Sequence, residues 1–144
     1  MGPVNSPKLA QLGIDKMKNV TMGGSQPITE LPSWLQYFDC AIIPFEKNRL
    51  TRSIYPLKIN EYLAAGQAVV ATHFSNDIAS FSDIIYLAED HDHFLKLIDQ
   101  FIAENSQKHI DARVEVASKN TWGARVKQLF KLIDQTLTKE TVSS

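Results

Sequence analysis

The sequence contains one cysteine, Cys40, among its 144 residues. An internal disulfide is therefore excluded, which fits a reducing compartment such as the cytoplasm. No apolar run approaches the ~20 residues that a membrane-spanning helix needs, and no basic stretch followed by an apolar one opens the chain. We therefore expect a cytoplasmic protein that has at most peripheral membrane contact.

An excess of charge of one sign is also missing. The 15 basic and 16 acidic side chains leave a net charge of −1, which offers no general attraction to nucleic acid or to anionic lipid. A Walker loop, a GxGxxG motif and a Ser-His-Asp order are absent too. A chain of this length can bury about 70% of its unfolded surface, which is enough for the core of one domain.

The most informative segment is Tyr55 to Thr72, which reads as loop, helix and buried strand. Pro56 lacks an N–H and has a preset φ, so it suits the first turn of a helix. Gly66 can adopt the left-handed conformation that ends one. The apolar side of this helix consists of Leu57, Ile59, Tyr62 and Leu63. Ala68 to Ala71 is a short apolar run typical of a strand covered on both faces in a parallel sheet.

The remaining chain alternates strand and helix patterns. Further strands are predicted at Val20 to Met22, Cys40 to Ile43 and Ile84 to Leu87. Helices are predicted at Thr29 to Phe38 with Thr29 as cap, from a cap at Asp92 to about Asn105, at Asp111 to Lys119, and after a cap at Thr121. Core-facing residues of the first two are Leu31, Trp34, Leu35, Phe38, Phe94, Leu97, Ile98, Phe101 and Ile102. The last helix carries an apolar stripe of Trp122, Val126, Leu129, Phe130, Ile133 and Leu137.

This order predicts an α/β fold with a Rossmann-like parallel sheet of about four strands flanked by helices. Residues 1–18 are expected to be irregular with one helical turn, residues 19–138 to form the domain, and residues 139–144 to fray.

Glu61 lies in the middle of the Tyr55 to Thr72 helix, on a side distinct from its apolar stripe. The free N–H groups at Tyr55, Leu57 and Lys58 could bind phosphate oxygens, with about 0.3 to 1 kcal/mol from the helix dipole. Glu61 could then accept hydrogen bonds from ribose hydroxyls. The helix alone equally permits an ordinary surface glutamate paired with Lys58.

Other candidate residues are open to two interpretations. Gly23 and Gly24 allow a backbone to approach a ligand closely, or form a plain turn. Arg49 and Arg52 lie in the loop Glu46 to Ser53, at the strand end where open α/β sheets bind ligands; they could reach a diphosphate or be solvated.

The histidines and the cysteine indicate no metal site. The run Glu89 to His93 contains ligand types, but a helix cap and dipole explain its carboxylates and no second cluster adds ligands. His73 could border an active site or be structural, His109 has no visible partner, and Cys40 is interpreted as a core thiol.

Five pieces occur in a particular order: NVTMGG, LPSWLQYFDCAIIPF, YPLKINEYLAAGQAVVAT, IIYLA and NTWGARVKQLFKLI. This order resembles the C-terminal, nucleotide-sugar-binding domain of GT-B glycosyltransferases, particularly glycosyltransferase family 4. The resemblance implies that Glu61 is the second glutamate of the family's paired-glutamate motif and holds the donor ribose. It places Tyr55, Pro56, Leu57 and Lys58 beside the diphosphate and sugar, and Gly23 and Gly24 beside the base.

The sequence departs from the family pattern in several places. Ser53 stands where the first glutamate is expected, and Pro56 replaces a glycine, so Leu57 and Lys58 carry more of the phosphate contact. The family's diphosphate-gripping basic residues and its N-terminal acceptor-binding domain precede the part that matches here. We therefore expect a truncated GT-B domain, inactive by itself, from an enzyme that transfers sugar from a nucleotide-sugar donor to a glycan or lipid-linked acceptor. No cofactor or metal is expected.

Two alternatives stay open. One is a non-catalytic nucleotide-binding or assembly module that keeps the fold, and the other is a relative of nucleotide-sugar epimerases. The family's strand order, 3-2-1-4-5-6, would leave a gap beside the Cys40 strand. Either Val20 to Met22 pairs there, or another copy of the chain fills the gap. The expected protein partner is accordingly a second copy in a homodimer, or else the missing N-terminal half.

Overall fold

The segment that begins at Pro56 forms helix α3 (Leu57–Ala64) and strand β2 (Val69–Thr72) in a computed structural model that describes residues 11–142. Pro56 is the residue before the first helical turn, and Gly66 follows the last with a φ of 71°. The Gly66 N–H donates to the Leu63 carbonyl at 3.0 Å, and the Gln67 N–H donates to the Tyr62 carbonyl at 2.9 Å. This pair of bonds satisfies the carbonyls at the helix end. The predicted start and stop are confirmed to within one residue.

The sheet is parallel and its strand order is β1-β2-β3. Strand β1 is Ala41–Ile43 and strand β3 is Tyr86–Ala88. Ala41 lies opposite Val69, and Val70 lies opposite Tyr86. The predicted α/β class with a Rossmann-like sheet is confirmed, with three strands in the described part of the chain instead of about four.

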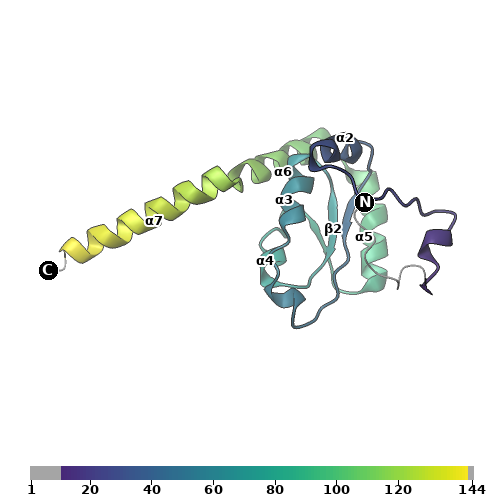
Figure 1. Ribbon diagram of the computed structural model, residues 1–144, viewed down its shortest axis with the longest axis horizontal. Helices are drawn as coiled ribbons and strands as arrows, with labels where there is room; N and C mark the ends of the chain where they lie inside the picture. Colours follow the sequence, from purple (N-terminus) through teal and green to yellow (C-terminus); the bar gives the residue numbers. More distant parts are fainter. Residues whose placement is uncertain (1–10, 143–144) are drawn as a thin grey trace. The chain divides into compact units, whose positions relative to one another are not determined.

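Helices cover both faces of the sheet (Figure 1). On one face Val69 and Ala71 pack with α3, α4 (Asn76–Ala79) and α6 (Gln107–Lys119). On the other face Val70 packs against Phe94 and Leu97 of α5 (His91–Glu104). Alternate residues of β2 are therefore buried on opposite faces, as the unbroken apolar run predicted.

Helix α6 is held against the end of α3 by a residue that sequence patterns did not single out. Arg113 is only 3% exposed, and its Nη1 donates to the Gly66 carbonyl at 2.9 Å and to Asn105 Oδ1 at 3.0 Å. Its guanidinium lies 4.7 Å from the centroid of the Phe101 ring. Burial lowers the pKa of Arg113. A Cβ added to Gly66 would lie 2.7 Å from Ile110 Cγ2, so the two helices touch at this glycine.

Helix α5 begins earlier than predicted, because Asp90 and not Asp92 is its cap. The Asp90 carboxylate accepts a hydrogen bond from the His93 N–H at 2.8 Å. Strand β3 ends at Ala88, so Asp90 is the first aspartate whose backbone can turn into a helix. The predicted core face is confirmed for Phe94, Leu97 and Phe101, whereas Ile102 is 53% exposed.

Helix α6 also begins earlier than predicted, at Gln107. Ser106 caps it in a capping box with His109, which therefore has a partner after all. Thr121 is confirmed as the cap of α7 (Trp122–Val142), since its hydroxyl accepts a hydrogen bond from the Ala124 N–H at 3.2 Å. The apolar stripe of α7 is largely exposed, with Trp122 at 79%.

Residues 11–37 form a separate unit from the one that begins at Phe38. This unit contains the 3-10 helices η1 (Ile14–Lys16) and η2 (Ile28–Glu30), followed by α2 (Leu31–Leu35). Leu35 is buried, but Trp34 and Phe38 are exposed, and no side chain caps the start of η2 or α2. The predicted cap at Thr29 is therefore wrong.

The predicted strand at Val20 to Met22 is wrong as well, because these residues are irregular. Three residues form a strand only where a neighbouring strand pairs with their N–H and C=O groups, and none does so here within the described residues. The described sheet gives no support to the option in which they pair beside the Cys40 strand. Residues 1–10 of the expected irregular segment and Ser143 and Ser144 of the expected frayed tail lie outside the described residues.

Cys40 lies beside the α5 face of the sheet and is half-buried. Its thiol donates to the Ala41 carbonyl at 3.3 Å, and burial raises its pKa. A raised pKa keeps the thiol protonated and weakly nucleophilic, in line with the predicted core role. In the part of the chain that the structure describes, no helix combines the length and apolar character needed to cross a bilayer.

Candidate functional site

The candidate site is the edge of the sheet where the three parallel strands end. The segments that follow β1, β2 and β3 meet there, and the N-terminus of α3 opens at the same edge because α3 returns the chain from the end of β1 to the start of β2. Open α/β sheets bind their ligands at this edge. Most of the segments in which candidate residues were predicted from the sequence therefore lie at this edge of the sheet.

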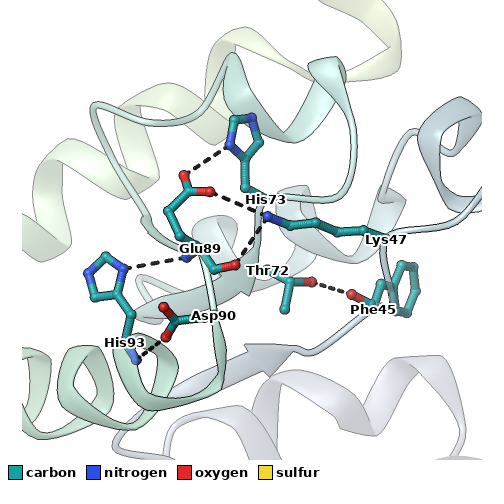
Figure 2. A network of polar contacts seen from close by, with 7 residues as sticks. All are labelled: Phe45, Lys47, Thr72, His73, Glu89, Asp90 and His93. Carbon is teal, nitrogen blue, oxygen red and sulfur yellow. Dashed lines mark hydrogen bonds and ion pairs between the residues drawn. The ribbon is translucent and has the colours of Figure 1, made fainter.

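A polar network joins the three strand ends (Figure 2). Lys47 Nζ lies 3.3 Å from Glu89 Oε2 and donates to the Glu89 carbonyl at 3.2 Å. His73 Nδ1 lies 3.3 Å from Glu89 Oε1. The Thr72 hydroxyl donates to the Phe45 carbonyl and so links the ends of β2 and β1. From the sequence, His73 was considered as a residue at the border of the site. The contacts of Lys47 and His73 with Glu89 were not predicted.

In the run Glu89 to His93, Asp90 and His93 make hydrogen bonds with the backbone at the start of α5. Asp90 caps the helix, and the backbone N–H of Glu89 donates to His93 Nδ1 at 3.4 Å. Among residues 11–142, no group of three or more histidine, cysteine or acidic side chains is arranged to hold a metal ion. Local helix capping accounts for this acidic run.

The loop after β1 has a defined internal structure. Asn48 Oδ1 accepts hydrogen bonds from the N–H groups of Leu50 and Thr51 at 2.9 and 3.0 Å. The buried Thr51 hydroxyl donates to the Glu46 carbonyl and starts the 3-10 helix η3 (Thr51–Ser53). These bonds fix the conformation of the loop. Its exposed residues Arg49, Leu50 and Ser53 line a shallow hollow in the surface. Arg52 is exposed on the same short helix.

The first turn of α3 presents free N–H groups, as the start of an α-helix does, and phosphate binding by them stays a prediction. No side chain caps this end, Leu57 and Lys58 are exposed, and Pro56 is buried. Glu61 is exposed one turn further on, opposite the fully buried Ile59 and Leu63. No ion pair joins Glu61 to Lys58, both of which the structure describes, so the alternative of a paired surface glutamate has no support in the geometry.

Tyr55 binds the side chain of Arg125 next to the start of α3. Its hydroxyl accepts hydrogen bonds from Arg125 Nη2 at 2.8 Å and Asn60 Nδ2 at 3.0 Å, and the Arg125 guanidinium lies 5.0 Å from its ring centroid. Asn60 Oδ1 is buried and has no hydrogen-bond partner in the described structure. The sequence placed Arg125 only in a helix pattern, because a residue 70 positions from Tyr55 leaves no local signal.

Gly23 and Gly24 belong to the unit of residues 11–37, which is described by itself. Gly24 has a φ of 64°, and nothing lies within 4 Å of the Cβ that a side chain would add. The Gln26 side chain donates to the Gly23 carbonyl at 2.7 Å. These features describe a turn, and the expected contact with a base stays a prediction.

The network makes Glu89 more acidic than an ordinary glutamate. The hydrogen bond from His73 lowers the pKa of Glu89, and the hydrogen bond and charge of Lys47 lower it further. Because the folded-state pKa is lowered, the contact favours the folded state above the ordinary pKa and is lost as pH falls through the lowered one. We expect His73→Ala and Lys47→Met each to raise the pKa of Glu89. Carbon-detected NMR titration of the Glu89 carboxyl measures this, and an unchanged pKa in both variants contradicts it.

The chain forms an α/β domain with a polar network at the carboxyl edge of its sheet, and comparison with known proteins indicates which class of protein it resembles. No family model and no solved structure matches the chain. Over 120 residues, which are 81% of this chain, it is 24% identical to a Bacillus subtilis (strain 168) protein named, as a provisional assignment, teichuronic acid biosynthesis glycosyltransferase TuaH. The match spans 30% of the length of TuaH. The chain is thus distantly similar to a glycosyltransferase.

Proposed function

We propose that this chain forms the donor-binding part of a glycosyltransferase. The enzyme would transfer sugar from a nucleotide-sugar donor to a glycan or lipid-linked acceptor, in the cytoplasm. The distant similarity to TuaH supports the reaction class, and the name of that protein refers to teichuronic acid biosynthesis. The acceptor would be bound outside the region that these 144 residues form.

The structural observation that carries the proposal is the exposed start of α3 at the carboxyl edge of the sheet, with Glu61 accessible one turn away. In this proposal the N–H groups of Leu57 and Lys58 bind diphosphate oxygens, and the Glu61 carboxylate accepts hydrogen bonds from the ribose hydroxyls. Arg125, held by Tyr55, and Arg52 add positive charge for the diphosphate. Gly23 and Gly24 would border the base.

Isothermal titration calorimetry with UDP, GDP and other nucleoside diphosphates tests this proposal. A hydrogen bond to a charged group contributes about 1.5 to 3 kcal/mol, so Glu61→Gln should weaken binding by about 10- to 100-fold. The 2′,3′-dideoxy nucleotide should bind wild type and Glu61→Gln equally weakly, because it cannot make the bonds that the variant removes.

Glu115→Gln is the matched control for Glu61→Gln. Glu115 is an exposed glutamate on α6 whose partner is Lys119, at 2.6 Å. It should leave nucleotide affinity unchanged. The proposal is refuted by equal affinity of wild type and Glu61→Gln for the ribonucleotide, or by binding of no nucleotide at all.

One observation favours a second candidate, a non-catalytic nucleotide-binding module. Ser53 lies in the exposed loop after β1 at the position that the resemblance assigns to a glutamate contacting the donor sugar. A serine hydroxyl cannot supply that charge. Equal affinity for a nucleoside diphosphate and its sugar conjugates would favour this candidate, whereas tighter binding of one conjugate would favour the transferase.

A further inference from the structure

Three side chains from separate strand ends converge at the carboxyl edge of the sheet. Lys47 belongs to the loop after β1, His73 directly follows β2, and Glu89 directly follows β3. Each Glu89 carboxylate oxygen has one of the other two as its partner, at 3.3 Å in both cases (Figure 2). The backbone of adjacent strands thus places an ammonium and an imidazole around one oxyanion.

The three side chains are accessible to solvent, and another anion can take the place of the Glu89 carboxylate. The side chains of Lys47, His73 and Glu89 are 44%, 39% and 63% exposed. Exposed ion pairs are screened by water and contribute little, so another anion can replace the carboxylate at small cost. The neighbouring side chains of Asp90 and His93 are engaged with the start of α5 through the Asp90 cap and the Glu89 N–H.

We infer that Lys47 and His73 form an oxyanion-binding pair for the diphosphate of the donor, and that the Glu89 carboxylate competes with the diphosphate for them. This inference rests on the proposed function. A diphosphate carries more negative charge than one carboxylate and presents several acceptor oxygens, so it attracts Lys47 more strongly than Glu89 does.

Calorimetric titration of the 144-residue chain with inorganic pyrophosphate tests the pair without any assumption about the base. Lys47→Met should weaken pyrophosphate binding about tenfold, and His73→Ala should weaken it to a smaller extent. Glu89→Gln should tighten binding about three- to tenfold, because glutamine keeps the shape but no longer competes as an anion. Unchanged or weaker binding by Glu89→Gln overturns the inference.

A double variant shows whether the two effects share one site. In Lys47→Met/Glu89→Gln the gain from Glu89→Gln should shrink to less than twofold, because its cation is gone. The exposed pair Glu115 and Lys119 of α6 supplies matched controls, and Glu115→Gln and Lys119→Met should leave pyrophosphate affinity unchanged. Thermal unfolding of each variant identifies a purely structural network: a lowered Tm with unchanged affinity overturns the inference.

Measuring the binding of nucleoside diphosphates to the same variants distinguishes this inference from the proposed function. If Glu61→Gln weakens nucleotide binding while Lys47→Met and Glu89→Gln leave it unchanged, the donor site stands and the oxyanion pair is wrong. If pyrophosphate responds to Lys47→Met and Glu89→Gln as expected but Glu61→Gln has no effect on nucleotides, the pair stands and the ribose role is wrong. Binding of neither ligand overturns both.

Discussion

Replacing Gly66 with alanine should destabilise the protein by about 2 to 5 kcal/mol, which is the sum of two physical costs. A non-glycine residue in the left-handed region costs about 1 to 2 kcal/mol, and the φ of 71° lies in that region. The new Cβ would also lie 2.7 Å from Ile110 Cγ2, and such overpacking typically costs about 1 to 3 kcal/mol. Chemical denaturation with urea measures the change in the free energy of unfolding.

Two further variants separate these costs. Gly123→Ala is the control, because Gly123 lies in the first turn of α7 with nothing within 4 Å of its added Cβ, so alanine should stabilise by up to about 1 kcal/mol. Ile110→Ala makes room for the Cβ, so the double variant Gly66→Ala/Ile110→Ala should lose less stability than the sum of the single losses. A loss for Gly66→Ala below about 0.5 kcal/mol contradicts the described contact between α3 and α6.

Replacing Arg113 with alanine is the second change for which we expect a large effect, again a loss of about 2 to 4 kcal/mol. The guanidinium donates to the Gly66 carbonyl and to Asn105 Oδ1, and its removal leaves the buried carbonyl without that donor. Removal also deletes the contact with the Phe101 ring. Urea denaturation measures the loss of stability.

Arg113→Lys tests whether the guanidinium group matters and not only its charge. Both hydrogen bonds come from the single nitrogen Nη1, but an ammonium lacks the planar group that lies over the Phe101 ring, so lysine should recover less than half of the loss. The exposed Lys119 on the same helix is the control, and Lys119→Met should change stability by less than about 0.5 kcal/mol. Because Arg113 and Gly66 are in contact, the Gly66→Ala/Arg113→Ala double variant should be non-additive. Full recovery by Arg113→Lys contradicts the proposed role of the guanidinium group.

Local signals in the sequence predicted the central unit of the fold well. The proline start and glycine stop of α3 and the unbroken apolar run of β2 are properties of neighbouring residues, so the sequence shows them directly. Which of two similar neighbouring residues caps a helix was predicted less well. Asp90 and Asp92 are equally good caps in a sequence, and the end of β3 decides between them.

The candidate site was predictable in part for the same reason. Lys58 and Glu61 are exposed on α3 where the helix pattern placed them, whereas Leu57, which was predicted on the apolar side of this helix, is 62% exposed. The partners that lie far apart in the chain were missed. Lys47 and Glu89 are 42 positions apart, and Arg125 and Tyr55 are 70 apart, distances over which no periodic pattern extends.

The amino-acid sequence by itself determined the α/β class, the limits of α3, the apolar run of β2 and the exposure of Glu61, because all of these follow from helix and strand periods and from the backbone freedom of proline and glycine. Tertiary structure alone decided that Val20 to Met22 is no strand, that Arg113 binds Gly66, and that Lys47 and His73 share Glu89. Strand pairing and contacts between strand ends depend on which distant segments become neighbours in the fold, and only packing of the whole domain settles that.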